Sequence, residues 1–260
     1  DWAEDKAGRD KKIAGIKQLV TKDKEKTPPQ WYVNSQGQPM VVIPGPVEFV
    51  MGSPTTEIGR YDIGGQDEGQ HKMRISRTFA IAAKLVTASE FQRFYKDYKS
   101  TKYNPTPTCP VISMSWYSAA SYCNWLSREE GIPEDQWCYL IEGDEMNIKA
   151  NYLSLTGYRL PTETEMEYAI RSETTAARYY GETEELLEKY SWIIHNCQER
   201  TWPVGTLKPN DFGVFDAIGN VYISGTYFWK CYFGPNDSIG NNTANDQIYI
   251  TKLNATGIEV

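Results

Sequence analysis

The stretch Gly157–Ser172, which reads GYRLPTETEMEYAIRS, constrains the fold more than any other part of the sequence. Thr162 is followed three residues later by Glu165, which is the pattern of a capping box. In a capping box each of the two side chains binds the other residue's backbone N–H, so that a helix can begin there. Apolar residues then recur at helical spacing and predict the buried side of the helix: Met166, Ala169 and Ile170.

The same stretch carries three glutamates, which could instead be carboxylates for acid–base catalysis. Negative charge near the first turn stabilises a helix through its dipole, which accounts for Glu163 and Glu165. Glu167 and Arg171 are four residues apart, in the order that favours an ion pair along the helix. Because helix formation accounts for every one of these residues, we interpret the stretch as structural rather than as an active site.

The rest of the chain shows short strands and helices without the alternation of a parallel sheet, which predicts an α+β fold with many loops. Strands are predicted at residues 40–43 and 47–51, and a single half-buried strand within residues 74–87. A second capping box, Thr87 with Glu90, starts a helix, and another helix is predicted at about 116–130. Residues 140–156 read as an inserted loop, and residues near 183–190 as a charged helix.

Residues 1–30 differ in composition from the rest of the chain. They are rich in charged residues, with Ile13, Ile16, Leu19 and Val20 at helical spacing, and they end in the linker sequence KDKEKTPP. This pattern predicts an amphipathic helix that is the tail of a preceding domain or a strap on the following one. Since the first residue is Asp1, we expect a processed chain or part of a longer one.

Composition limits the partners. The formal net charge of −7 argues against nucleic acid, and no apolar run reaches the ~20 residues that cross a membrane. The cysteines are odd in number and widely spaced, at positions 109, 123, 138, 197 and 231. This pattern is typical of reduced, buried thiols in a cytoplasmic protein rather than of disulfides or a zinc site.

Several motifs, in order, resemble those of the formylglycine-generating-enzyme family, also called the sulfatase-modifying-factor family. They are FVMGSP (49–54), FAIAAKLVTASEFQRF (79–94), VISMSWYSAASYCNWLS (111–127), GYRLPTETEMEYAIRS and WPVGTLKPNDFGVFDAIGNV (202–221). The resemblance covers residues 31–222 and leaves 223–260 diverged. It implies a variant of the C-type-lectin-like fold, with short strands, two main helices and many loops. It also implies a bacterial multidomain protein in which this domain, residues 31–260, follows another.

The resemblance implies a copper chemistry that this chain does not visibly support. Active members hold Cu(I) on a pair of cysteines after the Gly-Asn-Val motif and oxidise a substrate cysteine. Here that region reads GNVYISG, and only Cys231 follows it. Soft Cu(I) prefers thiolate ligands, so one cysteine does not make the site, although the approach of a distant thiol such as Cys197 stays open. With His71 and His195 as the only histidines, a three-histidine iron site is excluded as well. No catalytic residue is therefore assigned.

A calcium site is also implied by the resemblance, at positions that fall on Asp216, Gly219, Val221 and Ile223. Ile223 stands where the family uses Glu and offers no side-chain oxygen. Ca²⁺ prefers six to eight oxygen ligands, so we expect a weakened site on Asp216, Gly219 and Val221. The alternative is a tight turn held by its own hydrogen bonds.

Aromatic residues crowd the diverged C-terminal part, and a C-type-lectin-like fold commonly presents its ligand surface there. The candidate ligand-binding residues are Tyr222, Tyr227, Trp229 and Tyr232. The alternative is that these side chains fill the core. The sequence thus predicts a non-catalytic binding or scaffold module for a protein or small-molecule ligand. A retroelement-diversified display protein is one form of it. The alternative function is a copper-dependent oxidase that makes formylglycine.

Overall fold

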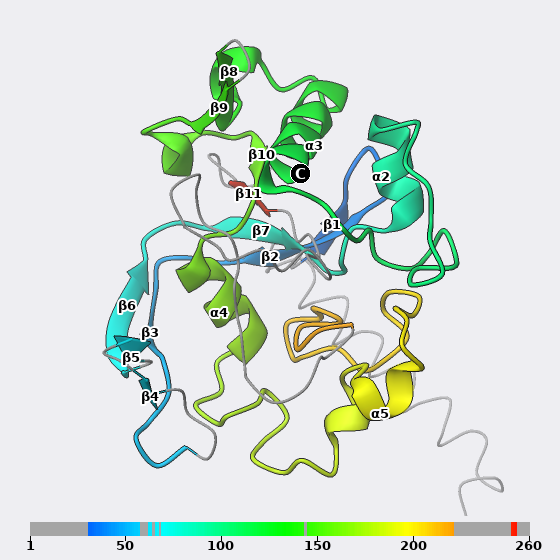
Figure 1. The fold of residues 1–260 in the computed structure, drawn as a ribbon. Coiled ribbons are helices and arrows are strands. Elements are labelled where there is room, and N and C mark those ends of the chain that lie inside the picture. Colours follow the sequence, from blue (N-terminus) through cyan, green and yellow to red (C-terminus); the bar gives the residue numbers. More distant parts are fainter. Residues whose placement is uncertain are drawn as a thin grey trace, which may run out of the picture.

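A computed structural model describes residues 31–57, 62–63, 66–67, 69–142, 145–220 and 251–253. At its centre lies an antiparallel five-stranded sheet in the order β1-β2-β7-β11-β10 (Figure 1). The strands are β1 (Trp31–Val33), β2 (Pro39–Ile43), β7 (Phe79–Ala82), β10 (Tyr158–Arg159) and β11 (Thr251–Leu253). Because β11 lies between β7 and β10, part of the diverged C-terminal region belongs to the central sheet.

Three two-stranded pairs and several short helices complete the described part of the chain. The strand pairs are β3 (Val47–Met51) with β6 (His71–Ile75), β4 (Asp62–Ile63) with β5 (Gln66–Asp67), and β8 (Tyr139–Glu142) with β9 (Glu145–Ile148). The helices are α2 (Ala88–Phe94), α3 (Trp116–Glu129), α4 (Glu163–Arg171) and α5 (Ile194–Cys197). Short 3-10 turns occur at Glu134–Gln136, Tyr152–Ser154 and Leu187–Lys189. The α+β fold class predicted from the sequence is confirmed.

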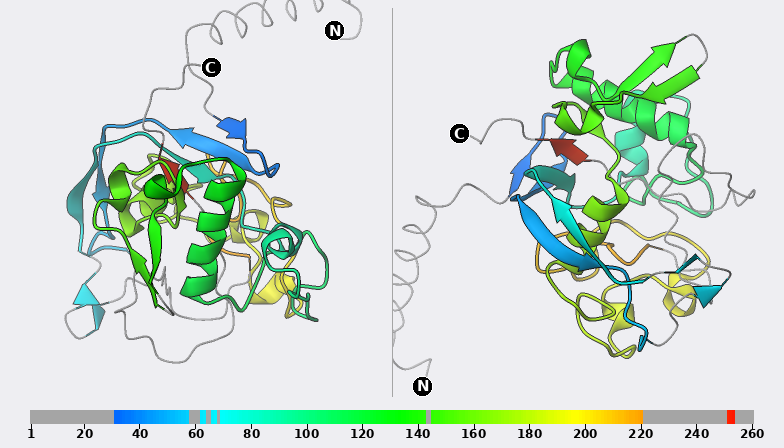
Figure 2. Two further views of the ribbon diagram at one scale, coloured as in Figure 1. Left: turned by 90° about the horizontal axis from the view of Figure 1, so that it is seen from above. Right: turned by 90° about the vertical axis from the view of Figure 1, so that its left-hand side faces the viewer.

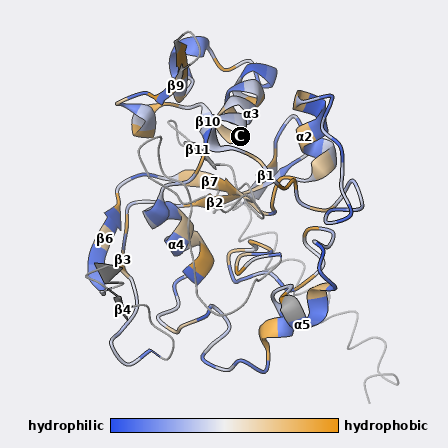
Figure 3. Ribbon diagram, in the orientation of Figure 1, coloured by the Kyte–Doolittle hydropathy of each residue, from blue (hydrophilic) through white to orange (hydrophobic). Residues whose placement is uncertain are grey.

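The central sheet is covered on both faces, by α3 on one side and α4 on the other (Figures 1 and 2). Successive residues of a strand point to opposite faces, so alternate residues of β2 and β7 enter two different cores. One core contains Met40, Ala80 and Ala82, and the other contains Val41, Ile43, Phe79 and Ile81. Figure 3 shows the resulting hydrophobic colour along β2 and β7.

Several sequence predictions need correction here. The half-buried strand expected within 74–87 is wrong, because β6 and β7 are separate and every residue of β7 is buried between two helical layers. The inserted loop expected at 140–156 is wrong as well, since it forms the β8–β9 hairpin and a 3-10 turn. The charged helix expected near 183–190 is reduced to the 3-10 turn at Leu187–Lys189. The predicted N-terminal helix lies outside the described residues.

The predicted helix starts are confirmed. At α4 the Thr162 side chain accepts a hydrogen bond from the Glu165 N–H at 3.2 Å, and the Glu165 carboxylate accepts one from the Thr162 N–H at 2.9 Å. Thr87 and Glu90 form the same capping box at α2. At α3 the N-cap is Ser115, whose hydroxyl accepts from the Ser118 N–H.

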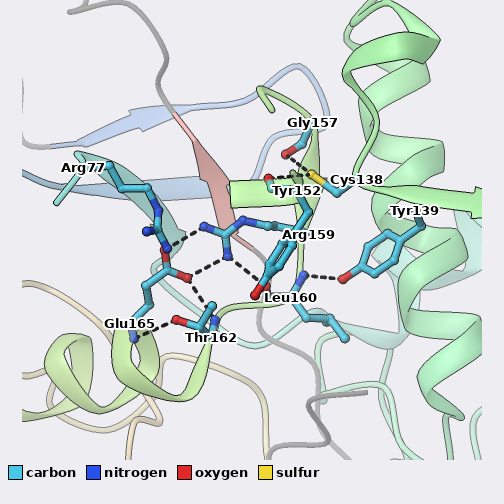
Figure 4. A network of polar contacts seen from close by, with 9 residues as sticks. All are labelled: Arg77, Cys138, Tyr139, Tyr152, Gly157, Arg159, Leu160, Thr162 and Glu165. Carbon is cyan, nitrogen blue, oxygen red and sulfur yellow. Dashed lines mark hydrogen bonds and ion pairs between the residues drawn. The ribbon is translucent and has the colours of Figure 1, made fainter. Parts of the chain in front are cut away.

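Glu165 also forms an ion pair that its capping role did not predict. Its side chain is fully buried and accepts two hydrogen bonds of 2.6 Å each from the fully buried guanidinium of Arg159 on β10 (Figure 4). Arg77, between β6 and β7, donates a third at 2.6 Å. Burial alone would raise the pKa of the Glu165 carboxyl. The hydrogen bonds and charge of Arg159, together with the Thr162 N–H and the charge of Arg77, hold that pKa below its ordinary value.

Two further sets of bonds fix α4 to distant segments. Arg171 and Glu167 form the predicted ion pair at 2.7 Å, and both also bind Gly52 of the FVMGSP motif. Glu167 accepts from the Gly52 N–H at 2.8 Å, and Arg171 donates to the Gly52 carbonyl at 2.8 Å. At the other end of the helix, the Asn210 amide donates to the carbonyls of Ala169 and Ile170. Three of the five quoted motifs thus meet at α4.

The buried ion pair leads to a stability prediction. Replacing Glu165 with Gln leaves the Arg159 charge buried without a counter-charge, so we expect the free energy of unfolding to fall by about 3–5 kcal/mol. The measurement is urea unfolding. The matched control is Glu163→Gln, in the same helical turn but exposed, which we expect to change stability by less than about 0.5 kcal/mol. Similar small losses in both variants would contradict the structural role of the pair.

Candidate functional site

The motif DAIGNV begins with a tight turn that its own hydrogen bonds hold together. Asp216 is in the left-handed region at φ 54, and its carbonyl accepts from the Gly219 N–H at 2.9 Å. The Asp216 carboxylate accepts from the Gly205 N–H at 2.8 Å and from the Asn220 amide at 3.4 Å. Asn220 in turn accepts from the Trp202 N–H at 2.8 Å. The turn therefore joins the segment around Gly205 to the start of the C-terminal region.

The Asp216 carboxylate is only partly compensated in this position. The residue is buried, and burial raises its pKa from an ordinary 3.8 to about 6. The Gly205 N–H, the Asn220 amide and the charge of Lys84 act in the opposite direction but do not offset the burial. The Asp216 carboxyl is therefore difficult to ionise at mildly acidic pH.

These contacts bear on the predicted calcium site. The side chain of Asp216 and the backbone of Gly219 lie in one turn, whereas Val221 lies outside the described residues. The Gly219 carbonyl already accepts from the Ser191 hydroxyl at 3.0 Å. The described donors of the predicted site are thus one carboxylate and one backbone carbonyl, each of which already accepts a hydrogen bond, whereas Ca²⁺ prefers six to eight oxygens. Within the described residues no cluster of three or more His, Cys, Asp or Glu could hold a metal ion.

The predicted ligand-binding residues Tyr222, Tyr227, Trp229 and Tyr232 all lie outside the described residues. Aromatic residues that the sequence analysis did not single out surround the turn instead. Trp192 and Trp202 stack at 4.6 Å between ring centroids, and the Arg200 guanidinium lies 4.1 Å from the Trp202 ring centre. The Trp202 indole N–H donates to the Cys197 carbonyl at 2.8 Å, which fixes this stack to α5.

A second aromatic cluster consists of three tyrosines. Tyr180 and Tyr190 stack at 4.4 Å, and Tyr179 contacts both rings edge-on. Burial and the nearby charges of Tyr180, Tyr190 and Asp216 raise the pKa of Tyr179. The two clusters are adjacent in sequence because only Ser191 separates Tyr190 from Trp192. The hydroxyl of Ser191 binds Gly219, so both clusters flank the Asp216–Asn220 turn.

The sequence contained a weak signal for this surface. The Tyr179–Tyr180 pair and the two tryptophans stand outside the predicted helices and strands, so that the sequence assigned their side chains to no core. Only the folded chain brings the segments around residues 179, 190 and 202 to the same turn.

The described cysteines are all buried: Cys109, Cys123, Cys138 and Cys197. Burial raises the pKa of Cys123, and it raises that of Cys138 to about 11. Both groups are therefore thiols rather than thiolates near neutral pH. Cys138 and Cys109 donate weak hydrogen bonds to backbone carbonyls. The burial predicted from the cysteine pattern is confirmed for these four, and Cys231 lies outside the described residues.

The protein is a mixed α+β domain. The motifs quoted above supply the polar side chains that hold its segments together, and its loops carry aromatic residues. The family model described as sulfatase-modifying factor enzyme 1-like domain matches residues 25–232. The chain therefore belongs to this family, as its motifs predicted. No helix in the described part of the chain has both the length and the apolar character needed to span a membrane.

Curated relatives match parts of the chain. Chaperone protein LppX of Paenibacillus barcinonensis is 30% identical over 141 residues, which are 43% of this chain and 49% of that protein. The formylglycine-generating enzyme of Mycobacterium tuberculosis is 39% identical over 82 residues, which are 27% of this chain and 27% of that enzyme. The chain thus spans half or less of the length of these relatives.

Two solved structures share the fold over nearly their whole length. PvdO of Pseudomonas aeruginosa has a TM-score of 0.62 and 19% identity, covering 87% of this chain and 99% of that one. Treponema denticola variable protein 1 has a TM-score of 0.61 and 20% identity, covering 87% of this chain and 100% of that one. At these identities the likeness concerns the fold.

The buried carboxylate leads to a pH prediction. Because the pKa of Asp216 is higher in the folded than in the unfolded chain, folding takes up a proton there at mildly acidic pH. Its contribution to stability is therefore present below the ordinary pKa of 3.8 and lost as pH rises through about 6. We expect this group to lower the free energy of unfolding by up to about 3 kcal/mol across that window.

The variant Asp216→Asn tests this dependence, because an amide cannot take up the proton. Chemical unfolding measured from pH 4 to 7, a range of about 3 units around the shifted pKa, compares the variant with the unsubstituted chain. We expect the variant to have the flatter profile, and Asp211→Asn, exposed in the same loop, to keep the original slope. An unchanged slope in Asp216→Asn would contradict the assigned pKa shift.

Proposed function

We propose that this domain is a non-catalytic binding or scaffold module of a larger bacterial protein, which holds a protein or small-molecule ligand through its C-terminal face. The observation that supports this proposal is that polar side chains of the family motifs are engaged in hydrogen bonds within the protein. Their polar side chains bind the protein's own backbone and one another, at Gly52, at the Arg159–Glu165 pair, at Asn210 and at the Asp216–Asn220 turn. Side chains engaged in this way support a framework.

The ligand surface in this proposal combines the described aromatic clusters with the aromatic residues that follow Asn220. The Asp216–Asn220 turn leads from the clusters directly toward Tyr222 and Tyr227 in the sequence. Aromatic side chains contribute large contact areas and are favoured in binding patches. A retroelement-diversified display scaffold is one form of the proposal, since loops can change while the polar framework remains.

The competing function is a copper-dependent oxidase that makes formylglycine. It is supported by the family itself and by the resemblance to formylglycine-generating enzymes. Its difficulty lies in the thiols, because Cys123 and Cys138 are buried groups with raised pKa values, and the sequence after the Gly-Asn-Val motif offers only Cys231. The leading proposal also includes a cytoplasmic location and an upstream domain of the same polypeptide as a partner.

Cu(I) titration against a chromogenic chelator separates the two functions. We expect no stoichiometric binding that competes with the chelator, because Cu(I) requires accessible thiolate ligands. The Cys231→Ser variant is the control, and Cys138→Ser is a second control for a buried thiol. Tight stoichiometric binding that Cys231→Ser abolishes would overturn the proposal in favour of the oxidase.

The calcium assignment is tested in the same way. Because Asp216 is the carboxylate in the predicted donor set, we expect only weak binding, with a dissociation constant of about 1 mM or above. The measurement is the thermal midpoint with and without added Ca²⁺, compared with Asp216→Asn. A large rise at micromolar Ca²⁺ that is missing in the variant would show a tight site instead.

A further inference from the structure

Four cations lie against aromatic rings in the segments around the Asp216–Asn220 turn. One is Lys84, 5.3 Å from the ring centre of Phe215, and the other three stand on loops that backbone bonds join. Besides Arg200 over Trp202 at 4.1 Å, the Lys102 ammonium lies 4.9 Å from the Tyr103 ring centre. Lys208 lies 5.8 Å from the ring centre of Tyr190. A cation over a ring face is attracted by the negative charge of that face, which holds a flexible side chain in one place.

Backbone bonds join the loops that carry these pairs. The Tyr103 carbonyl accepts from the N–H of Thr201 at 2.6 Å and from its hydroxyl at 2.9 Å, which places the Lys102–Tyr103 loop against Arg200 and Trp202. The Lys208 N–H donates to the Lys189 carbonyl at 3.1 Å, beside Tyr190. We call the set the cation–aromatic surface. Its members are Lys102, Tyr103, Tyr190, Trp192, Arg200, Trp202 and Lys208.

The cations of this surface have no acidic partner among the described residues. The ion pairs of that part of the chain involve other arginines: Arg74, Arg77, Arg128, Arg159, Arg171 and Arg178. The planar guanidinium of Arg carries N–H groups that can donate two parallel hydrogen bonds to a carboxylate. Tyr103 is 49% exposed and offers an aromatic contact beside it.

The backbone that presents Arg200 is strained. Gln198 and Glu199 both have left-handed conformations, at φ 55 and φ 56, although neither is glycine. Each such residue costs about 1–3 kcal/mol and persists only where the surrounding structure imposes it. The Arg200 N–H donates to the Cys197 carbonyl at 3.3 Å, and the Trp202 indole N–H donates to the same carbonyl at 2.8 Å. These bonds hold the backbone on both sides of Arg200 next to the end of α5.

We propose that the cation–aromatic surface binds an acidic segment of a partner protein, with Arg200 holding a carboxylate and the exposed Tyr103 ring contacting its apolar or aromatic side chains. This inference rests on the proposed function and specifies the ligand class. The chain as a whole has a net charge of −7, so an acidic segment is repelled over much of the surface and attracted here. The contrast between the acidic chain and the cations of this surface therefore favours an acidic ligand at this position.

A protein segment fits this surface better than a nucleic acid. Phosphate backbones require an extended basic stripe, whereas this surface offers three cations. A short acidic peptide requires only the charges of Arg200 and Lys102.

The test is fluorescence anisotropy with a labelled peptide of alternating Glu and Tyr. Two peptides of the same length serve as probes for charge, one with Gln and one with Lys in place of Glu. We expect the Glu peptide to bind at low ionic strength and to weaken at about 0.15 M salt, where surface charges are screened beyond about 8 Å. The Gln and Lys peptides are expected not to bind.

Variants locate the binding. We expect Arg200→Gln to weaken the Glu peptide about tenfold, equivalent to about 1.4 kcal/mol, and Lys102→Gln to weaken it about threefold. Lys72→Gln, exposed on β6 away from this surface, is the matched control and is expected to leave the affinity unchanged. Circular dichroism and the thermal midpoint check that each variant keeps the native fold.

Three results would overturn the inference: equal loss in Lys72→Gln and Arg200→Gln, equal binding of the Gln peptide, and tighter binding of a single-stranded oligonucleotide of the same charge. The outcome is independent of the copper titration, because Arg200→Gln leaves Cys231 in place. A failed peptide assay with no Cu(I) binding would remove only the ligand assignment. Tight Cu(I) binding would remove the proposed function itself.

Discussion

The rest of the structure depends on the buried ion pair between Arg159 and Glu165. Both side chains are fully buried, so neither charge is hydrated and each must be matched within the protein. Arg159 comes from β10 of the central sheet and Glu165 from the first turn of α4, so the pair fixes that helix against the sheet (Figure 4). Arg77 adds a second guanidinium from the connection between β6 and β7. An ion pair that is so costly to break is a strong constraint on how these three segments pack.

Hydrogen bonds between side chains and backbone groups connect α4 to further segments of the chain. Glu167 and Arg171 bind both backbone groups of Gly52, and Asn210 binds the last carbonyls of the helix while accepting from the backbone of Phe212 and Val214. The chain then reaches the Asp216–Asn220 turn. Segments far apart in the sequence are therefore held by polar side chains that satisfy backbone groups which a loop-rich domain would otherwise leave unpaired.

Two sets of residues can be distinguished in the domain: polar residues that hold its segments together, and aromatic residues on its loops. The framework consists of motif residues with buried polar contacts, and the aromatic clusters, which include Trp202 of the last motif, stand on the loops that these contacts hold in place. Binding residues on loops can change without loss of the fold as long as the framework bonds persist. Family membership consequently identifies the fold and does not by itself identify the activity.

Local patterns in the sequence determined the helix starts, the strands at β2 and β3 and the family. Capping boxes and residue periodicity act within a few positions, so they can be recognised without the fold. Tertiary structure alone decided that Glu165 pairs with Arg77, 88 positions away, and that β7 is covered on both faces. It also decided that β11 lies within the sheet and that Arg200, Trp202 and Tyr103 share one surface. The physical reason is that charge pairing and ring stacking depend on distance in space, which residue spacing along a loop-rich chain does not specify.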